Sequence, residues 1–317
     1  MRVLIAGGGV AGLEAALTLR ELAADQTDVT VLAPEETFEI RALSVRDAFG
    51  SRPPQRHRLA DLAADAGFAL ETGRLASVDP GARTVTTDGG ATLAYDALLL
   101  AIGARAERAL PHAGMFGGPQ HAEAVHGMLQ DLEVGSAKRI AFVAPPGNTW
   151  PLPVYELALL TSERARSLGL NDVSIVVVTP EERPLQIFGD EASAAVSELL
   201  AERGIAVLNS TAVGAETRVP ALEAAGRRLP VDRIIALPVL RGPQVPGLPA
   251  DEDGFLPVDE HQQVVDGVWA AGDGTAFPIK QGGIAAQQAD VAALAIAAAA
   301  GVDVEVPAFR PCCAGCC

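Results

Sequence analysis

Apolar residues fall along this chain in short runs that are separated by glycine-rich or polar stretches. Residues 3–6, 29–32 and 97–101 are short apolar runs typical of buried strands, whereas residues 13–24 have the length and composition of a helix. A strand, a turn, a helix and a second strand in this order predict a βαβ unit. Because such crossovers join parallel strands, the opening segment predicts a parallel sheet.

The same alternation returns in the middle of the chain and again near its end. The pattern predicts strands at 139–143, 174–178 and 268–271, helices at 154–167, 190–203 and 283–300, and a hairpin at 84–92. Asp190 is the expected N-cap of its helix, and Gly204 the expected stop. Proline-rich residues 237–250 are typical of a crossing linker. We therefore predict an α/β fold, with a discontinuous Rossmann-like domain over 1–110 and 246–317 and a second Rossmann-like domain inserted over 111–245.

Composition narrows the partners that this chain can have. Apolar residues make up 49% of it and charged residues 20%, which excludes wholesale disorder. A net charge of −16 disfavours nucleic acid and anionic lipid surfaces. The longest apolar run, 291–300, is far shorter than a membrane span, and we find no signal peptide. All four cysteines lie in the last six residues, so no disulfide framework is expected. We expect a cytoplasmic protein with peripheral membrane contact at most, and a homodimer is left open.

A glycine motif joins the first strand to the first helix. Gly7-x-Gly9-x-x-Gly12 lies where a dinucleotide site requires it: Gly7 for the tight turn, Gly9 for the approach of the pyrophosphate, Gly12 for helix–strand packing. The helix that begins with Val10 and Ala11 then directs N–H groups and partial positive charge at the phosphates. The motif predicts a bound dinucleotide.

The residue that holds the adenosine ribose is less well defined. An acidic residue usually ends the second strand of such a unit, but Ala33 stands there. Glu35 is the nearest carboxylate and could reach the ribose from the loop. A solvated loop charge is an equally good interpretation of Glu35.

A second glycine-rich loop decides which dinucleotide is expected. Residues 270–283, AAGDGTAFPIKQGG, resemble the distal flavin loop of flavoproteins with two dinucleotide-binding domains. This resemblance implies that FAD is the cofactor, that Gly272, Asp273 and Gly283 contact it, and that Asp273 binds its ribityl chain. It also places Lys280 beside the flavin, where a cation would favour the reduced form, so Lys280 is a catalytic candidate as well.

Further segments make the resemblance more specific. Ala101 and Gly103 flank Ile102 in a turn that corresponds to the Ala-Thr-Gly-like turn of the same flavoproteins, and Arg41 lies in the intervening segment. Residues 285–289 are similar to a helix start that meets flavin and quinone. The order of these motifs resembles the sulfide:quinone oxidoreductase and type II NADH dehydrogenase branch of the pyridine nucleotide-disulfide oxidoreductase superfamily, and implies an FAD-dependent oxidoreductase.

The inserted domain bears on the electron donor. Its corresponding loop, residues 144–151, contains Pro145, Pro146 and Trp150, and prolines remove the N–H donors that would hold a pyrophosphate. NAD(P)H is therefore disfavoured, and we expect a small reduced donor, a sulfur compound or a thiol, with a quinone-like acceptor or oxygen. The sulfide-oxidising relatives use cysteines beside the flavin, and residues 1–311 contain none. An NAD(P)H-dependent flavin reductase and a non-catalytic FAD-binding protein stay open as alternatives.

The C-terminal tail carries its own hypotheses. Cys312, Cys313, Cys316 and Cys317 form two vicinal pairs. A dithiol there could exchange electrons with the flavin or a thiol substrate. Mercuric reductases end in a similar cysteine pair, which suggests capture of a soft metal. The third interpretation is an engineered tag or an inert tail.

Overall fold

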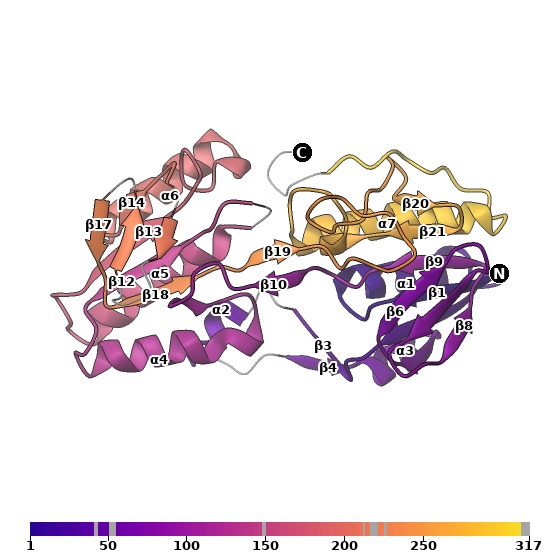
Figure 1. Ribbon diagram of the computed structural model, residues 1–317, viewed down its shortest axis with the longest axis horizontal. Helices are drawn as coiled ribbons and strands as arrows, with labels where there is room; N and C mark the ends of the chain where they lie inside the picture. The colour runs from indigo at the N-terminus through magenta and orange to yellow at the C-terminus, as the bar shows by residue number, and fades with distance from the viewer. Residues whose placement is uncertain are drawn as a thin grey trace. The chain divides into compact units, whose positions relative to one another are not determined.

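A computed structural model describes residues 1–40, 44–50, 55–147, 150–211, 213–215, 221–224 and 227–311. Within these residues the chain divides into two units. Unit 1 comprises Met1–Ile40, Gln55–Arg105 and the described part of Arg241–Cys313, and unit 2 comprises the described parts of Arg41–Pro54 and Ala106–Leu240. Figure 1 shows unit 1 around α1 and α7 and unit 2 around α4, α5 and α6.

Unit 1 is built on a six-stranded sheet in the order β20-β21-β9-β1-β2-β5, which is parallel except for β20. The strands are β1 (Arg2–Ala6), β2 (Asp28–Ala33), β5 (Ala69–Thr72), β9 (Ala97–Leu100), β20 (Gln263–Val265) and β21 (Val268–Ala270). Alternation along β1 sends Val3 and Ile5 into one apolar cluster and Leu4 and Ala6 into another. The sheet is therefore buried on both faces, which explains its nearly continuous apolar strands.

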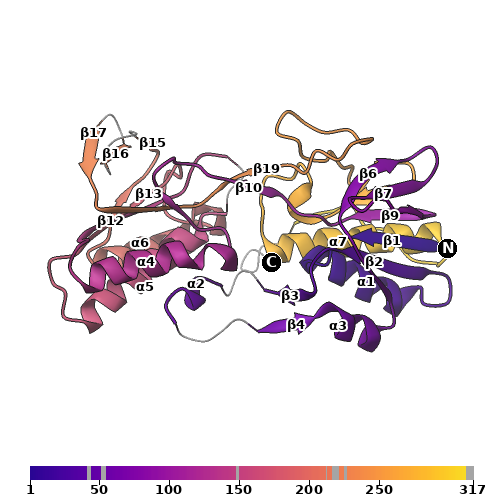
Figure 2. The same cartoon turned by 60° about the horizontal axis from the view of Figure 1, so that its bottom comes forward.

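Different layers cover the two faces of this sheet. Helices α1 (Val10–Leu22), α3 (Leu59–Ala66) and α7 (Gly282–Ala299) cover one face, and an antiparallel sheet of β6 (Leu75–Asp79), β7 (Thr84–Thr87) and β8 (Thr92–Ala94) covers the other. Figure 2 shows the two layers on opposite sides of β1. Strands β7 and β8 confirm the predicted hairpin. A short ladder of β3 (Thr37–Glu39) and β4 (Arg56–Arg58) completes the unit.

Unit 2 repeats this plan on a smaller sheet. Its five parallel strands run in the order β11-β18-β12-β13-β14: β11 (Gly114–Met115), β18 (Arg233–Ala236), β12 (Arg139–Val143), β13 (Ser174–Val178) and β14 (Ala206–Leu208). Helices α4 (Ala122–Glu133), α5 (Leu152–Ser167) and α6 (Asp190–Glu202) pack on one face. The antiparallel strands β15 (Val213–Ala215), β16 (Ala221–Ala224) and β17 (Arg227–Pro230) form a further sheet, and β16 contributes apolar residues to the other face.

The chain crosses between unit 1 and unit 2 in two short strands, β10 (Arg105–Glu107) and β19 (Val239–Arg241). These two strands pair with each other, and β19 lies in the proline-rich stretch predicted to be a linker. The short helix α2 (Ser44–Asp47) belongs to unit 2, where it contacts α4 and α5, although the segments before Arg41 and after Pro54 belong to unit 1. Nothing in the local sequence of α2 indicates that it packs in unit 2.

The α/β fold class is confirmed, and most element bounds agree with the sequence pattern. Strands β12 and β13 begin and end at the predicted residues. The predicted cap of α6 is wrong: Gly189, with φ of 93°, occupies the cap position, and Asp190 is the first helical residue. Asp190 instead accepts a 2.6 Å hydrogen bond from Arg183. Gly204, with φ of 68°, ends the helix as predicted.

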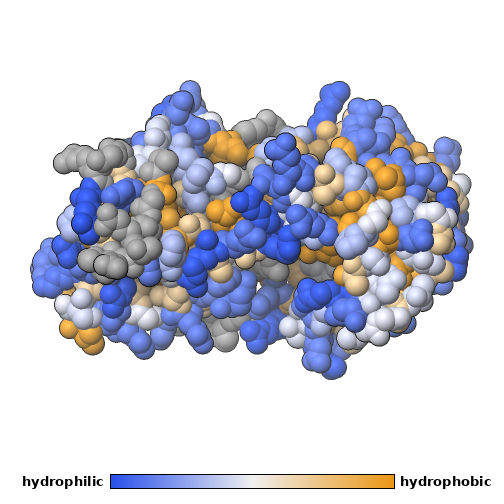
Figure 3. Space-filling view, in the orientation of Figure 1, coloured by the Kyte–Doolittle hydropathy of each residue, from blue (hydrophilic) through white to orange (hydrophobic). Residues whose placement is uncertain are grey.

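Helix α7 is long and apolar enough, by length and composition alone, to cross a membrane. Half of it is buried inside unit 1, where it packs along α1. A helix of the protein core has the same length and composition. On the face drawn in Figure 3, hydrophobic residues form separate patches among hydrophilic ones. Exposed large hydrophobic side chains in the described residues are correspondingly few: Leu17, Leu22, Ile40, Val134, Leu168 and Ile187.

Candidate functional site

Four neighbouring parallel strands of unit 1 end at the same edge of its sheet. In spatial order they are β21, β9, β1 and β2, and each is followed by a segment in which the sequence predicts cofactor contacts. In open parallel sheets, ligands bind at this carboxyl edge. These segments contain the following predicted site residues: Gly7, Gly9, Val10, Ala11, Gly12, Glu35, Ala101, Gly103, Gly272, Asp273, Lys280 and Gly283.

The turn between β1 and α1 is packed so tightly that it excludes side chains at two of its glycines. A methyl group added at Gly7 would lie 2.2 Å from the carbonyl oxygen of Ala101, and Gly7 has φ of 118°. A methyl group at Gly12 would lie 1.9 Å from the carbonyl oxygen of Gly7. These two glycines therefore shape the turn itself, as the motif predicts for helix–strand packing.

Gly9 differs from the other two because the space in front of it is open. A methyl group there would meet no atom within 4 Å. Gly9 is exposed and caps α1, whose first turn begins with Val10 and Ala11. The first turn of any α-helix leaves N–H groups without intrahelical acceptors, and the first turn of α1 carries no acidic residue to compete for them. The turn thus fits an anionic pyrophosphate.

The glycine turns that follow β1, β9 and β21 contact one another. A methyl group at Gly272 would lie 3.2 Å from the Cβ of Ala11, and one at Gly274 would lie 3.1 Å from the carbonyl oxygen of Gly103. Residues 101–103 are in turn the segment that abuts Gly7. Backbone from three distant parts of the sequence therefore meets at one place, which is the geometry that a dinucleotide running along the sheet edge needs.

The loop after β21 is held in shape by a residue from inside α7. Gln288, only 1% exposed, accepts a 2.9 Å hydrogen bond from the N–H of Gly272 and donates to the Thr275 hydroxyl at 3.2 Å. That hydroxyl donates to the Gly272 carbonyl at 3.0 Å. This network fixes the 3₁₀ turn η4 (Gly272–Gly274), which carries the half-buried Asp273.

Gln288 lies in the segment 285–289 that resembles a helix start meeting flavin and quinone, and the structure shows it buried and bound to the loop after β21, not on the helix surface. One signal could have indicated this burial, because Gln288 stands four residues after Ile284 and four before Ala292, on the buried face of an alanine-rich helix. A polar residue in such a position needs partners, and here it finds them in the cofactor loop.

Lys280 is buried at the end of the same loop. It is 5% exposed, and its Nζ donates to the carbonyl oxygens of Thr275 at 2.5 Å and Phe277 at 2.6 Å. The same nitrogen lies 3.9 Å from the centroid of the Phe255 ring. Burial lowers the pKa of Lys280 to about 8, against the opposing effect of Asp273 and Asp251. The amine is thus bound within its own loop.

The start of α7 is partly capped by the chain itself. The side chain of Gln281 accepts a 2.8 Å hydrogen bond from the N–H of Ile284. A methyl group at Gly283 would lie 3.0 Å from Gln281 Oε1, so the glycine leaves room for this cap. At Gly282 the space is open. The N-terminus of α7 therefore has a local acceptor for one N–H group.

The remaining predicted residues are Glu35, which the structure describes, and five residues that it does not. Glu35 is exposed just beyond the end of β2, where its carboxylate is available to a ribose. Arg41, Cys312, Cys313, Cys316 and Cys317 lie outside the described residues. Their proposed roles stay predictions.

Unit 2 has different chemistry at the equivalent edge of its sheet. The segment from β12 to α5 contains Pro145 and Pro146, and Trp150 packs edge-to-face on Phe188 with 5.1 Å between ring centroids. The described part of this segment keeps one glycine, Gly147, with φ of 113°, after the two prolines. Pro145 and Pro146 have no backbone N–H to offer a phosphate.

A carboxylate beyond the end of β13 is already bound within unit 2. Glu181 Oε2 accepts hydrogen bonds from the Tyr155 hydroxyl at 2.6 Å and the Thr179 hydroxyl at 3.0 Å. Burial raises the pKa of Glu181, and burial together with Glu181 raises the pKa of Tyr155. Thr179 and Pro180 separate Glu181 from the end of β13, and the sequence pattern did not single it out. The structure shows this carboxylate engaged by side chains of unit 2.

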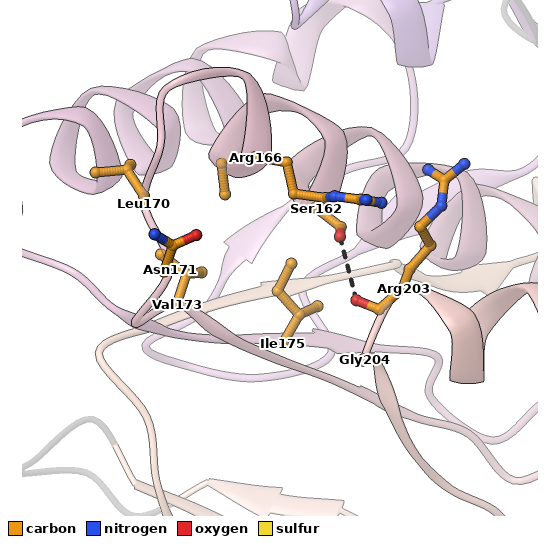
Figure 4. Close-up of a pocket in the computed structure, with 9 residues that line it drawn as sticks. Ser162, Arg166, Leu170, Asn171, Val173, Ile175, Arg203 and Gly204 are labelled. Carbon is orange, nitrogen blue, oxygen red and sulfur yellow. Dashed lines mark hydrogen bonds between the residues drawn. The ribbon is translucent and has the colours of Figure 1, made fainter.

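A small pocket elsewhere in unit 2 lies at the opposite edge of the sheet (Figure 4). It is lined by Ser162, Ala165, Arg166, Leu170, Asn171, Val173, Ile175, Arg203 and Gly204. The Ser162 hydroxyl donates to the Arg203 carbonyl at 3.4 Å. Helices α5 and α6 end here, so their dipoles direct partial negative charge at the pocket, while Arg166 and Arg203 in its lining carry positive charge. The described residues contain no cluster of three or more His, Cys, Asp or Glu side chains that could hold a metal.

The chain is similar to known proteins over most of its length. The family model described as pyridine nucleotide-disulphide oxidoreductase matches residues 1–146 and 155–298. An NADH dehydrogenase-like protein of Mycobacterium tuberculosis is 31% identical over 294 residues, which are 86% of this chain and 72% of the relative. The sulfide-quinone reductase of Aquifex aeolicus is 27% identical over 257 residues, 77% of this chain and 59% of the relative.

Solved structures show the same fold. The sulfide:quinone oxidoreductase from Aquifex aeolicus superposes with a TM-score of 0.85 and 24% identity, covering 93% of this chain and 76% of that structure. Putidaredoxin reductase, solved as a covalent complex with putidaredoxin, has a TM-score of 0.70 and 22% identity over 94% of this chain and 75% of that one.

Proposed function

Because this chain belongs to the pyridine nucleotide-disulphide oxidoreductase family, whose members are FAD-binding oxidoreductases, we propose that it oxidises a small reduced sulfur compound or thiol. The electrons would pass to a quinone-like acceptor or to oxygen. Bound FAD supplies the two-electron redox chemistry. The role of the chain is to hold that cofactor, to orient the donor beside it and to exclude competing donors.

The residues proposed to hold FAD are those that meet at the carboxyl edge of unit 1. Gly9, Val10 and Ala11 would direct N–H groups at the pyrophosphate, and Asp273 would accept hydrogen bonds from the ribityl chain. Glu35 is the proposed ribose contact. Gly7 and Gly12 would act through the shape of the turn, because neither has room for a side chain.

One observation supports the choice of donor: the β12–α5 segment of unit 2 has prolines where the corresponding turn of unit 1 has glycines. The two units share a plan, so the β12–α5 segment of unit 2 corresponds to the glycine turn of unit 1. Pro145 and Pro146 cannot donate to a pyrophosphate, and Glu181 is bound to Tyr155 and Thr179 rather than available to a ribose. Both features disfavour a nicotinamide dinucleotide as the donor in this proposal.

The proposal of a sulfur donor draws support from resemblance to the sulfide-quinone reductase of Aquifex aeolicus. It also sets a requirement, because residues 1–311 contain no cysteine. Thiol chemistry on the protein itself would have to use the four cysteines of residues 312–317. A donor that reacts directly with the cofactor needs none of them.

A second candidate is an NAD(P)H-dependent dehydrogenase. The 31% identity with an NADH dehydrogenase-like protein favours it. It requires a mode of nucleotide binding in unit 2 that does not use the usual glycine turn.

An anaerobic titration distinguishes these two functions. The purified FAD-bound protein is mixed separately with sulfide, a small dithiol, NADH and NADPH, and loss of the oxidised-flavin absorbance is followed with time. We expect sulfide or the dithiol to bleach the flavin faster than either nucleotide. Fast bleaching by NADH with no response to sulfide or dithiol would reverse the assignment.

A matched variant separates the two routes for sulfur donors. Replacing all four tail cysteines with serine removes every thiol of the chain. Unchanged bleaching by sulfide in this variant indicates a direct reaction with the cofactor, whereas its loss assigns the tail as the relay. If the dithiol and sulfide fail with both proteins, the proposed donor class is wrong.

A further inference from the structure

The loop that follows β21 is closed by contacts that do not involve any ligand. Lys280 binds the carbonyl oxygens of Thr275 and Phe277 from one side, at 2.5 and 2.6 Å. Gln288 binds the N–H of Gly272 and the hydroxyl of Thr275 from the other. Thr275, fully buried, takes part in both sets of contacts. Two side chains thus brace one loop at a shared residue.

The contacts of Lys280 within the loop replace water around its buried ammonium group. An ammonium group has three N–H donors, and two of them meet carbonyl oxygens at short distances. The Phe255 ring lies under the same nitrogen at 3.9 Å, which adds a cation–π contact. With a side chain that is 5% exposed, the amine has little contact with solvent.

We propose that Lys280 is a positioning residue: it holds the backbone of residues 272–280 in the shape that presents Asp273 to FAD, and it acts on the cofactor only through this loop. The proposal rests on FAD binding at this edge of unit 1, and not on the identity of the donor. It assigns Lys280 a role different from the direct flavin contact that the resemblance implies.

Two carboxylates and burial have opposite effects on the protonation of Lys280. The carboxylates that face it are Asp273 in η4 and Asp251 in the preceding loop, and both favour the ammonium form. Burial opposes them and has the larger effect, so the pKa falls to about 8. Loss of the proton leaves a neutral amine, which burial favours and which keeps two N–H donors for the two carbonyls.

The chain offers a matched control, because it has only two lysines. Lys138 is exposed and pairs with Asp172 in unit 2. Lys280→Met keeps a long apolar stem and removes the donors, Gln288→Leu removes the opposite brace, and Lys138→Met removes a lysine charge outside the loop. All three are compared with the wild-type chain.

Three measurements test the proposal. Amide hydrogen exchange is measured over residues 272–280 in FAD-free protein, the FAD dissociation constant is measured by flavin fluorescence, and the reduction potential of the bound flavin is measured with redox dyes. For Lys280→Met we expect faster exchange in this loop, FAD binding weaker by roughly tenfold to a hundredfold, and an unchanged potential, because hydrogen bonds to a charged group are lost while no flavin contact is. Gln288→Leu should loosen the same loop, and Lys138→Met should match the wild type.

The outcomes separate the competing roles. Unchanged exchange in the FAD-free Lys280→Met variant together with a shifted potential would establish direct flavin contact and overturn the proposal. Unchanged exchange and unchanged FAD affinity would also overturn it. If Lys280→Met does not fold, the same measurements are made on Lys280→Gln, which keeps two N–H donors without the charge. Faster exchange over residues 272–280 with an unchanged potential supports the proposal, and unchanged exchange overturns it. A wild-type chain that does not bind FAD refutes the proposed function. The exchange data would still test whether Lys280 holds the loop over residues 272–280.

Discussion

Gly9 and Gly12 of the glycine motif should respond differently to the same substitution: one variant should lose FAD affinity and the other stability. Gly9→Ala places a methyl group in open space, whereas Gly12→Ala places one 1.9 Å from the Gly7 carbonyl oxygen. Ordinary contacts of this kind begin near 3.4 Å, so in Gly12→Ala the backbone must move by about 1.5 Å. Overpacking of this kind costs roughly 1–3 kcal/mol. We expect Gly12→Ala to destabilise unit 1 by that amount.

Gly9→Ala should leave the free energy of unfolding within about 1 kcal/mol of the wild-type value. Alanine is a poorer cap than glycine, but it also restricts the unfolded chain, and the two effects oppose each other. The open space is where the pyrophosphate is proposed to lie, so the methyl group should weaken FAD binding. Loss of one or two hydrogen bonds to a charged group corresponds to roughly tenfold to a hundredfold or more.

Urea unfolding of FAD-free protein and FAD binding by fluorescence measure the two effects separately. Trp269 in β21 reports on unit 1, and Trp150 reports on unit 2. Gly127→Ala in α4 is the control, because its methyl group also meets no atom within 4 Å, yet it lies in unit 2. Wild-type FAD affinity in Gly9→Ala would refute the proposed pyrophosphate site. Equal stability of Gly9→Ala and Gly12→Ala would refute the packing argument.

Three further predictions concern charged and hydrogen-bonded groups. Because burial lowers the pKa of Lys280 to about 8, the unfolded chain binds this proton more tightly between about 8 and 10.5. The free energy of unfolding should therefore rise with pH across that window, by about 3 kcal/mol from this group, and the rise should be absent in Lys280→Met. Tyr155→Phe should destabilise unit 2 by roughly 1–3 kcal/mol, since Glu181 loses a donor in a half-buried site, and NADH binding should not appear in calorimetry. The Arg2 guanidinium lowers the pKa of Asp96 to about 2, so Asp96→Asn should remove a contribution that is present above 3.8 and lost as pH falls towards 2. That contribution is at most about 1 kcal/mol because the pair is exposed, and acid unfolding curves of the two proteins measure it.

Local signals account for what the sequence could predict. Strand β1 is a run of apolar residues, Gly7 and Gly12 mark a turn that excludes side chains, and α7 is a long alanine-rich helix; each depends on neighbours in sequence. The fold class follows from such patterns, and the loop over 270–283 that is proposed to hold FAD was predicted from its resemblance to a flavin loop. The cap of α6 could not be predicted this way. Gly189 and Asp190 are adjacent, and a glycine with a positive φ can take the cap position in place of an acidic residue.

Long-range contacts account for what the sequence could not predict. The partners of Lys280 became visible only when the loop was seen folded back on it, and Gln288 reaches Gly272 across sixteen residues. Glu181 stands beyond Thr179 and Pro180 after β13, and the sequence pattern did not single it out. Helix α2 joins unit 2 through contacts with α4 and α5 that leave no mark on its own four residues.

The difference between the two units shows where the function of this chain is decided. Both have a parallel sheet with helices on one face and an antiparallel sheet contributing to the other. At the β1–α1 connection unit 1 has open space at Gly9, whereas the β12–α5 connection of unit 2 contains Pro145, Pro146 and Trp150. Since the layers are alike, the fold alone does not select the ligand, and the proposed function assigns that choice to the N–H groups of these connections. On that proposal, unit 2 serves the reaction without holding a second dinucleotide in the usual way, and detection of tight NADH binding would refute it.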